Sequence, residues 1–593
     1  MTAGRTVLLA RDFERTLDAL VARLSADPPP GPVEAWLFED RAARAEAEAR
    51  LAGLGIAARI RTAYKPLLAF FREEADLSGV RSAVVRYPRH PATHPDRFLL
   101  ETYPLAMLLP DVAVRFEPGG TGLTYEVELH EEDGGCRRHQ VFAPNLVQAG
   151  SFGRPVLVTS GWLRIAGSTD GPLDTEYAAL FRQALDAVPA TGVAAARLEI
   201  RADITAEDEP LGWGDEVLSL AEALHEDLFF ALRERFQAGG GGNRPLQIVP
   251  DIRSGAAAIG LRITAGLPDD PDEAAGPPPA PLALCKRPLP LAEVQAALQA
   301  MGGRVFQARS VQGRPVPWLH KPGSVEPVLI SAAQHGNETS GVIGALRAAA
   351  VLMRRKRAHF ALIPVENVDG YALHQRLIAQ NPRHMHHAAR YTATGADLSA
   401  SRDDERLARL TALRRSGARL HLNLHGYPAH EWTRPLSGYL PAGFEQWTIP
   451  RGFFLIVTHH PGWGRMASRL MATLARRLGA DPALALANAR QLATLRQHSQ
   501  AQPFRVIAGI PCFLTEGRHY EAPLTVITEA PDETVHGAEF RRLHTAQMRA
   551  VLHAVAIYQK LCRPSRKRYR PRPPGRSWPV ARRHRPGSAR ACP

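Results

Sequence analysis

Four side chains that can bind a metal or transfer a proton follow apolar runs in the second half of the sequence. His335 and Glu338 stand three apart in "LISAAQHGNETSGVIGALRAA" (329–349), between an apolar run and an Ala- and Leu-rich stretch with helical periodicity. His425 ends the run "RLHLNLH", and Glu529 ends the run "PLTVITE". Imidazoles and carboxylates are typical ligands of a catalytic zinc, which has three protein ligands and one open position. A further carboxylate beside the metal can accept a proton from water.

Apolar runs that alternate with helical stretches predict the elements that carry these side chains. This alternation predicts an α/β fold: a mixed, mainly parallel sheet with helices on both faces. The predicted strands are residues 327–333, 359–365, 419–425, 452–458 and 523–529. In such sheets, sites collect just past the carboxyl ends of the strands. All four candidate side chains are therefore expected at the same rim of one sheet.

The motifs in this region resemble those of the zinc carboxypeptidase family, the M14 metallopeptidases. The resemblance covers residues 290–555 and depends on the ordered motifs "HGNE", "IPVENVDGY", "GADL", "LNLHG" and "TVITE". The "HGNE" motif is also similar to that of the succinylglutamate desuccinylase and aspartoacylase branch. The resemblance implies a carboxypeptidase-like fold and a Zn²⁺ cofactor. It implies His335, Glu338 and His425 as zinc ligands and Glu529 as general base.

The same resemblance implies residues that act on the substrate. An arginine that stabilises the oxyanion is expected upstream of Asp397, and the candidates are Arg390 and Arg383. Arg390 is preferred because it has the shorter path to Asp397, which leaves Arg383 as a candidate substrate-binding residue. Tyr520 in "EGRHYEAP" is the candidate for the mobile tyrosine of carboxypeptidases, although only nine residues separate it from Glu529.

One family feature is missing. In the family, an Asn–Arg pair that binds a substrate carboxylate follows the Asp of the "GADL"-type motif. Here Ser399 and Ala400 stand at those positions, and Arg402 is out of register. The motifs therefore do not predict recognition of a free C-terminal carboxylate.

Several other polar residues have competing interpretations. Glu516 follows a short apolar run and is the alternative to Glu529 as the base. The histidines after the second predicted strand are interpreted as pocket or surface residues rather than as a second metal site: His384, His386 and His387. His459 and His460 follow the strand 452–458 and could line the same pocket.

The chain of 593 residues is too long for one hydrophobic core, so we expect at least two domains. We expect an N-terminal α/β domain of unknown role over residues 1–265, which folds independently. A linker rich in Pro, Gly and acids then spans residues 266–284. The catalytic domain follows over residues 285–562, and residues 563–593 form a basic tail that is expected to be disordered.

Two features of the first 265 residues carry specific expectations. Residues 111–143 are predicted to form antiparallel strands joined by Gly-containing turns. A long amphipathic helix is predicted over residues 214–237, and its Glu222 and His225 are interpreted as part of a solvated face rather than as a site.

Charge and composition limit the classes of partner that the protein is expected to bind. The net charge is +14, but residues 563–593 hold eleven Lys and Arg residues, and without them the charge falls to +3. This distribution argues against a nucleic-acid-binding body. Five scattered cysteines without CxxC spacing indicate neither disulfides nor a thiolate zinc site. Apolar runs are too short for a membrane span, and the N-terminus does not resemble a secretory signal, so a cytoplasmic location is expected.

These observations predict a zinc-dependent hydrolase that cleaves an amide bond of a peptide or an acylated amino acid. The first alternative is an N-acyl amino acid deacylase, because the Asn–Arg pair is missing and the N-terminal domain could wall off the cleft. The second alternative is a binding protein that kept the fold and lost the chemistry; the complete set of three ligands and a base argues against it. The substrate and the oligomeric state are not predicted by these features.

Overall fold

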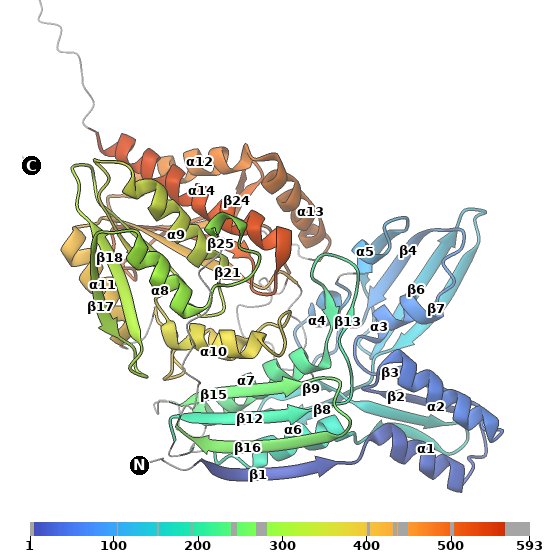
Figure 1. The fold of residues 1–593 in the computed structure, drawn as a ribbon. Coiled ribbons are helices and arrows are strands. Elements are labelled where there is room, and N and C mark those ends of the chain that lie inside the picture. The colour runs from blue at the N-terminus through green and yellow to red at the C-terminus, as the bar shows by residue number, and fades with distance from the viewer. Residues whose placement is uncertain are drawn as a thin grey trace, which may run out of the picture.

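A computed structural model shows how the chain folds (Figure 1). It describes residues 5–103, 105–150, 153–190, 193, 195–238, 246–267, 281–399, 404–430, 436, 449–498 and 503–563. Most of the predicted linker and nearly all of the predicted basic tail lie outside these described residues, as do Ala400 and Arg402.

The second half of the chain is built around a nine-stranded sheet with the order β17-β18-β20-β19-β21-β25-β22-β24-β23. The five strands predicted from the sequence are confirmed, since they correspond to β19 (Val328–Ala332), β20 (Phe360–Ile363), β21 (Leu420–Tyr427), β22 (Phe454–His459) and β25 (Leu524–Pro531). Apolar runs found them because a strand buried on both faces needs apolar side chains at every position.

The prediction of a mainly parallel sheet is wrong. Four of the eight neighbouring pairs of described strands are parallel and four are antiparallel. Both edges are hairpins that the sequence reading did not predict: β17 (Arg304–Arg309) with β18 (Pro315–Lys321), and β23 (Arg505–Ile507) with β24 (Ile510–Glu516). β22 also runs antiparallel to β25. Apolar composition reports burial and carries no information about strand direction.

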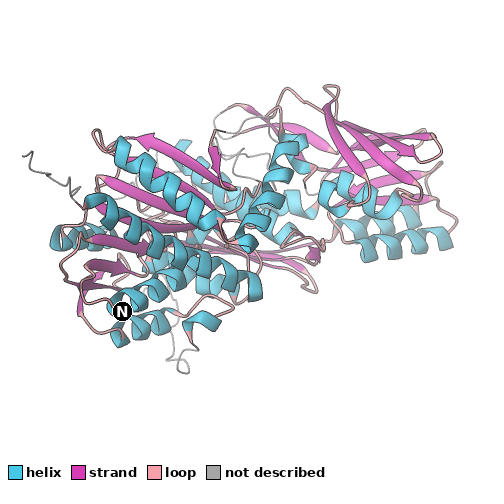
Figure 2. Cartoon of the chain, turned by 90° about the horizontal axis from the view of Figure 1, so that it is seen from above, coloured by secondary structure: helices cyan, strands magenta, loops and turns pink. Residues whose placement is uncertain are grey.

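Helices cover both faces of this sheet (Figure 2). Gly341 of α9 (Ser340–Met353) lies against Leu424 of β21, whereas His421 of the same strand lies near Arg409 of α11 (Asp404–Ser416). Side chains alternate between the faces of a strand, so residues three apart point to opposite faces. α9 also packs beside α14 (Gly537–Cys562), which contacts α12 (Gly464–Gly479). The prediction of helices on both faces is therefore confirmed.

The remaining helices of this half are shorter or lie at its margins. They are η2 (Leu282–Leu284), α8 (Leu291–Ala300), α10 (Val368–Ile378), η3 (His387–Ala389) and α13 (Pro482–His498). Among the described residues, no helix is both long and apolar enough to cross a membrane.

The first half of the chain contains several smaller sheets. β1 (Thr6–Phe13), β16 (Ile259–Gly266), β12 (Arg197–Asp203) and β15 (Gln247–Arg253) form one four-stranded sheet in that order. A second sheet has the order β11 (Thr169–Leu173), β10 (Gly161–Ile165), β2 (Val33–Leu37) and β3 (Ala58–Thr62). The helices α1 (Thr16–Ala26), α2 (Arg41–Gly53), α6 (Glu176–Asp186) and α7 (Leu220–Ala238) pack on these sheets.

The predicted antiparallel strands of residues 111–143 are confirmed in part. β6 (Thr124–Glu131) and β7 (Cys136–Phe142) form an antiparallel hairpin. β5 (Ala113–Pro118), however, pairs in parallel with β4 (Val80–Tyr87), which lies between β5 and β6. The third sheet therefore has the order β5-β4-β6-β7, and two short pairs, β8 (Asn145–Ala149) with β9 (Pro155–Thr159) and β13 (Glu209–Pro210) with β14 (Val217–Leu218), complete the first half.

The two halves share apolar clusters. One buried cluster unites Phe229 and Phe230 of α7 with Leu373 and Leu377 of α10. A smaller cluster brings Leu100 and Tyr103, from the region of α4 (Arg97–Glu101), against Leu492 and Leu495 of α13. The domain division at residues 266–284 stays a proposal, and these clusters show that the halves are packed together.

Candidate metal centre

His335 and Glu338 lie on the connection between β19 and α9. Ala333 takes a left-handed backbone conformation with φ 47°, and Glu338 donates its backbone N–H to the carbonyl of His335 at 3.2 Å. Gly336 does not have a positive φ, so its residue type is explained by the space around it. A Cβ atom at position 336 would lie 2.2 Å from the carbonyl carbon of Gly370 and 2.3 Å from the nitrogen of Tyr371. Glycine is therefore required because α10 approaches the turn closely.

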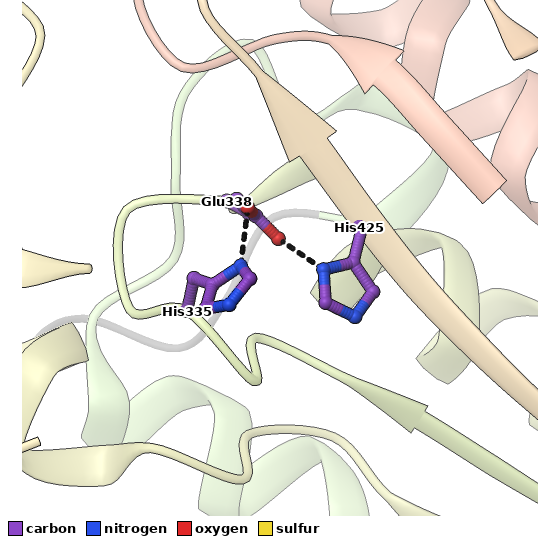
Figure 3. Close-up of side chains that lie close together, drawn as sticks. All are labelled: His335, Glu338 and His425. Carbon is purple, nitrogen blue, oxygen red and sulfur yellow. Dashed lines mark hydrogen bonds and ion pairs between the residues drawn. The ribbon is translucent and has the colours of Figure 1, made fainter. Parts of the chain in front are cut away.

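The side chains of His335, Glu338 and His425 face one point (Figure 3). Nδ1 of His335 lies 2.6 Å from Oε1 of Glu338, and Nδ1 of His425 lies 2.9 Å from Oε2 of the same carboxylate. One ligand atom from each residue lies within 4.8 Å of the other two, and all three residues are buried. Among the described residues this is the one group of three or more His, Cys, Asp or Glu side chains with such geometry.

This donor set fits a catalytic zinc ion. Two imidazole nitrogens and one carboxylate match the three protein ligands of such sites. The outward nitrogen of His335, Nε2, lies 3.3 Å from Oδ2 of Asp397. A carboxylate at that position is the usual partner of a zinc-bound histidine, because it fixes the ring orientation and raises the basicity of the ligand nitrogen. His335, Glu338 and His425 would hold the ion, and Asp397 would orient His335.

The charged groups around Glu338 and Asp397 favour the ionised forms of both carboxylates. Burial alone would raise the pKa of Glu338, but the imidazoles of His335 and His425 outweigh it and hold that pKa well below its usual range. Burial would likewise raise the pKa of Asp397, yet His335 and Arg390 hold it well below its ordinary value. Nη1 of Arg390 donates to Oε1 of Glu338 at 3.1 Å. Both carboxylates are therefore kept ionised, as metal ligation and its supporting hydrogen bonds require.

Glu529 lies beside the ligands on the neighbouring strand. β21 and β25 are parallel, and His425 is paired in register with Glu529, so their side chains point to the same face. Glu529 is 7% exposed, and burial raises its pKa well above the usual range, with a further contribution from the charge of Glu338. A bound cation would offset this effect, because its charge favours a nearby carboxylate.

Glu516, the alternative base, lies elsewhere. Its side chain is 58% exposed at the end of β24. Oε2 of this side chain lies 3.7 Å from Nδ1 of His459. The structure therefore places Glu529 beside the candidate metal ligands and Glu516 at the surface.

The two candidate arginines also differ in position: Arg390 lies at the site, and Arg383 lies at the surface. Arg390 contacts Glu338, and Asn367 holds the backbone of this segment by donating Nδ2 to the carbonyls of Arg390 and Tyr391 at 3.2 and 3.1 Å. Arg383 is exposed on the loop that precedes η3. Within the described residues, no hydrogen bond or ion pair joins Arg383 to the ligand set.

Tyr520 lies near the site, partly buried. Burial raises its pKa, and the charges of Glu529 and Asp397 act on it in the same direction. Ser399 donates both its backbone N–H, at 2.8 Å, and its Oγ, at 2.7 Å, to Oδ1 of Asp397. The residue at the expected carboxylate-binding position therefore supports Asp397.

Sequence reasoning missed two buried acids close to the centre. Asn337 donates Nδ2 to Oε2 of Glu533 at 2.7 Å. Asp532 accepts the backbone N–H of Ser340 at 2.7 Å, and burial raises its pKa to about 8. Burial also raises the pKa of Glu533 well above its usual range. The signal available in the sequence was the pair of acids that follows Glu529 within four residues, at the end of a buried strand.

The histidines between α10 and Arg390 are buried against the first half of the chain. Nε2 of His384 lies 3.2 Å from Oγ of Ser219 and hydrogen-bonds Asp208, and His387 is 3.1 Å from Oε2 of Glu226. The interpretation as pocket or surface histidines is therefore replaced by a role in packing between the halves. The solvated-face interpretation of Glu222 and His225 is wrong, because both are buried. A helix that is covered on both sides can bury charged residues where side chains of another segment form hydrogen bonds or ion pairs with them.

Comparisons with known proteins were made on the whole chain. No family model matches it, and no curated protein matches it at the significance required. Solved structures similar to it include a metallo-carboxypeptidase from Burkholderia cenocepacia, with 18% identity over 46% of this chain and 70% of that chain and a TM-score of 0.28.

Two further structures represent related chemistries. The murein-tripeptide amidase MpaA from Escherichia coli O157 shows 14% identity over 44% of this chain and 95% of that chain, with a TM-score of 0.23. A succinylglutamatedesuccinylase/aspartoacylase from Rhodobacter sphaeroides shows 13% identity over 43% of this chain and 65% of that chain, also with a TM-score of 0.23. These include the same two groups that the sequence motifs resemble. Since every TM-score is below 0.5, function is argued below from the residues of the site.

Proposed function

We propose that this protein is a zinc-dependent hydrolase that cleaves the amide bond of a peptide or an acylated amino acid. The observation that carries the proposal is the convergence of His335, Glu338 and His425 beside the buried carboxylate of Glu529. Zinc bound there would polarise the amide carbonyl and acidify water. Glu529 accepts the proton of the attacking water and returns it to the leaving nitrogen.

Arg390 stabilises the oxyanion that develops on the substrate carbonyl. Its guanidinium already reaches the ligand set through Glu338, and the surrounding carboxylates outweigh the effect of burial and raise its pKa. A fixed positive charge at a buried site stabilises a developing negative charge more strongly than it would in water. Tyr520 and Arg383 are proposed to contact the substrate further from the reacting bond.

One observation favours the deacylase form of this activity over removal of a residue from a long peptide. Ser399, which stands where a carboxylate-binding asparagine is expected, is engaged with Asp397. This position is therefore not arranged to bind a free C-terminal carboxylate.

The proposal is tested by metal analysis and a substrate screen. The purified protein is expected to contain one zinc per chain and to hydrolyse members of a panel of N-acylated dipeptides and of N-acetylated and N-succinylated amino acids. A chelator should abolish the hydrolysis, and added zinc should restore it. Faster turnover of acylated amino acids than of dipeptides would select the deacylase form.

His425→Ala should lose both zinc and hydrolysis, because two ligands hold zinc far more weakly than three. The matched control is His359→Ala. His359 precedes β20, a strand parallel to β19, and so lies at the opposite edge of the sheet. Stoichiometric zinc in His425→Ala would overturn the ligand set, and a zinc-loaded wild type that hydrolyses nothing in the panel would favour a binding protein.

A further inference from the structure

Helix α7, from the first half of the chain, is buried between two layers. On one side it packs on β15 of the four-stranded sheet (Figure 1), and on the other it contacts η3, the short helix just before Arg390. Its residues from Ala221 to Leu232 are all buried. A helix buried on every side is expected to make specific contacts with both layers.

The carboxylate of Glu222 on α7 joins two segments of the catalytic half. Its Oε1 accepts the backbone N–H of Met385 at 3.0 Å and lies 2.8 Å from Nε2 of His430. Met385 begins the segment that leads to Arg390, and His430 comes five residues after His425. One buried acid therefore ties together the segments that carry a proposed metal ligand and the proposed oxyanion arginine.

Aromatic contacts hold the same segment on both sides of Arg390. The ring of Phe229 stacks on that of Tyr391, with centroids 5.4 Å apart and an angle of 22°. The ring of Phe230 lies 5.0 Å from that of His387. The guanidinium of Arg233 lies 4.3 Å from the centroid of the Tyr391 ring, on the residue directly after Arg390.

We infer that α7 positions Arg390, so that the first half of the chain completes the active site. The inference rests on the proposed function, since it gives Arg390 its role at the reacting carbonyl. Within the catalytic half, Asn367 holds the carbonyls of Arg390 and Tyr391, and α10 packs against η3. From the first half, Phe230 and Phe229 contact the rings of His387 and Tyr391, and Glu222 accepts the amide of Met385. These are positioning residues, which act on catalysis through Arg390.

Two variants loosen the segment from α7. Glu222→Ala removes the acceptor for Met385 and His430, and Phe229→Leu keeps apolar volume but removes the ring that stacks on Tyr391. Each should lower kcat for the panel substrate about 10-fold or more, because small displacements of a catalytic group cost rate steeply. KM and zinc content should stay near wild type. Glu222→Gln keeps an acceptor oxygen and should retain most of kcat.

The matched control is Leu180→Ala. Leu180 is buried in α6, which packs on α7, β1 and β16 and belongs to the same half. This truncation should lower the melting temperature as the loosening variants do, with kcat per folded molecule unchanged. If it lowers kcat as much as Phe229→Leu, the effect is general destabilisation and the positioning role is overturned.

Hydrogen–deuterium exchange gives a readout that does not need activity. In Glu222→Ala and Phe229→Leu, the amides of residues 384–391 should exchange faster than in wild type, and in Leu180→Ala they should not. The Co²⁺-substituted protein should show a changed visible spectrum in the loosening variants, because Arg390 contacts Glu338. If wild type hydrolyses no panel substrate, the proposed function fails, and the exchange and spectrum decide the positioning of Arg390 by themselves. Unchanged exchange, or loosened exchange with unchanged kcat in an active enzyme, overturns the inference.

Discussion

Buried acids are partnered differently in two regions of this molecule. In the first half, two buried acids each pair with one arginine: Glu39 accepts from Nε of Arg15 at 2.8 Å, and Asp251 accepts from Nη2 of Arg253 at 3.1 Å. At the rim of the nine-stranded sheet, Glu338, Glu529, Asp532 and Glu533 gather within one region. Burial raises the pKa values of Glu529, Asp532 and Glu533, and the negative charge of Glu338 raises them further.

This difference distinguishes acids whose arginine pairs support the fold from acids whose gathering indicates a chemical role. In a one-to-one pair the arginine offsets part of the cost of burying the carboxylate, although burial still raises the pKa of Glu39. Acids that raise one another's pKa values cost stability in the absence of a cation, so their gathering points to a bound metal or a proton-transfer role. The predictions below test the two kinds of acid against each other.

The largest effect is expected at Glu529. Glu529→Gln should retain zinc and lose about 10²–10⁴-fold in kcat, because the base acts in the transition state and not in metal binding. Steady-state kinetics with metal analysis measure this. The matched control is Glu516→Gln, an exposed acid on the nearby strand β24, which should stay close to wild type. The opposite ranking of the two variants would reassign the base.

A smaller effect is expected at Asp397. Asp397→Asn keeps the shape but removes the charge next to Nε2 of His335, which should weaken zinc binding about 10–100-fold. Competition with a chromophoric chelator measures the affinity. Asp369→Asn is the control for another acid of the same half that is paired with a cationic partner, since Asp369 pairs with Arg314 at 2.9 Å. Equal loss of zinc affinity in the two variants would contradict a specific role for Asp397.

The last prediction concerns Glu176, a buried acid of the first half that is partnered by a hydroxyl. Its carboxylate accepts from the hydroxyl of Thr16, and burial raises its pKa from 4.5 to about 7. The folded protein therefore binds a proton more tightly than the unfolded chain, so stability falls as pH rises from about 4.5 to about 7 and then levels off. Glu176→Gln should remove this slope and raise the free energy of unfolding at pH 8 by up to about 3 kcal/mol.

Urea denaturation between pH 5 and pH 8 measures that slope. Glu46→Gln, an exposed substitution on α2, should leave it as in wild type. If Glu176→Gln keeps the wild-type slope, Glu176 is ionised in the folded protein, and burial does not raise its pKa.

Local sequence pattern was sufficient to predict many of the strands and site positions in the second half of the chain. The five apolar runs predicted five strands, and the position of His335, Glu338 and His425 after or at the ends of those runs predicted that they meet. Both inferences depend on short-range rules: a buried strand must be apolar, and parallel strands end at one rim. The same rules could not predict that β22 runs antiparallel, because the composition of a strand is the same in both directions.

The sequence by itself determined the types of the metal ligands, their placement at strand ends and the linear order of the motifs. Only the tertiary structure decided that α7 is buried on all sides, that Glu222 reaches Met385 and His430, and that Arg390 rather than Arg383 contacts Glu338. These contacts join residues separated by up to 208 positions, as for Glu222 and His430, and each appears locally as an ordinary amphipathic helix or loop. Periodicity reports which face of an element is apolar, and the partner that covers its polar face is set by the packing of the whole chain.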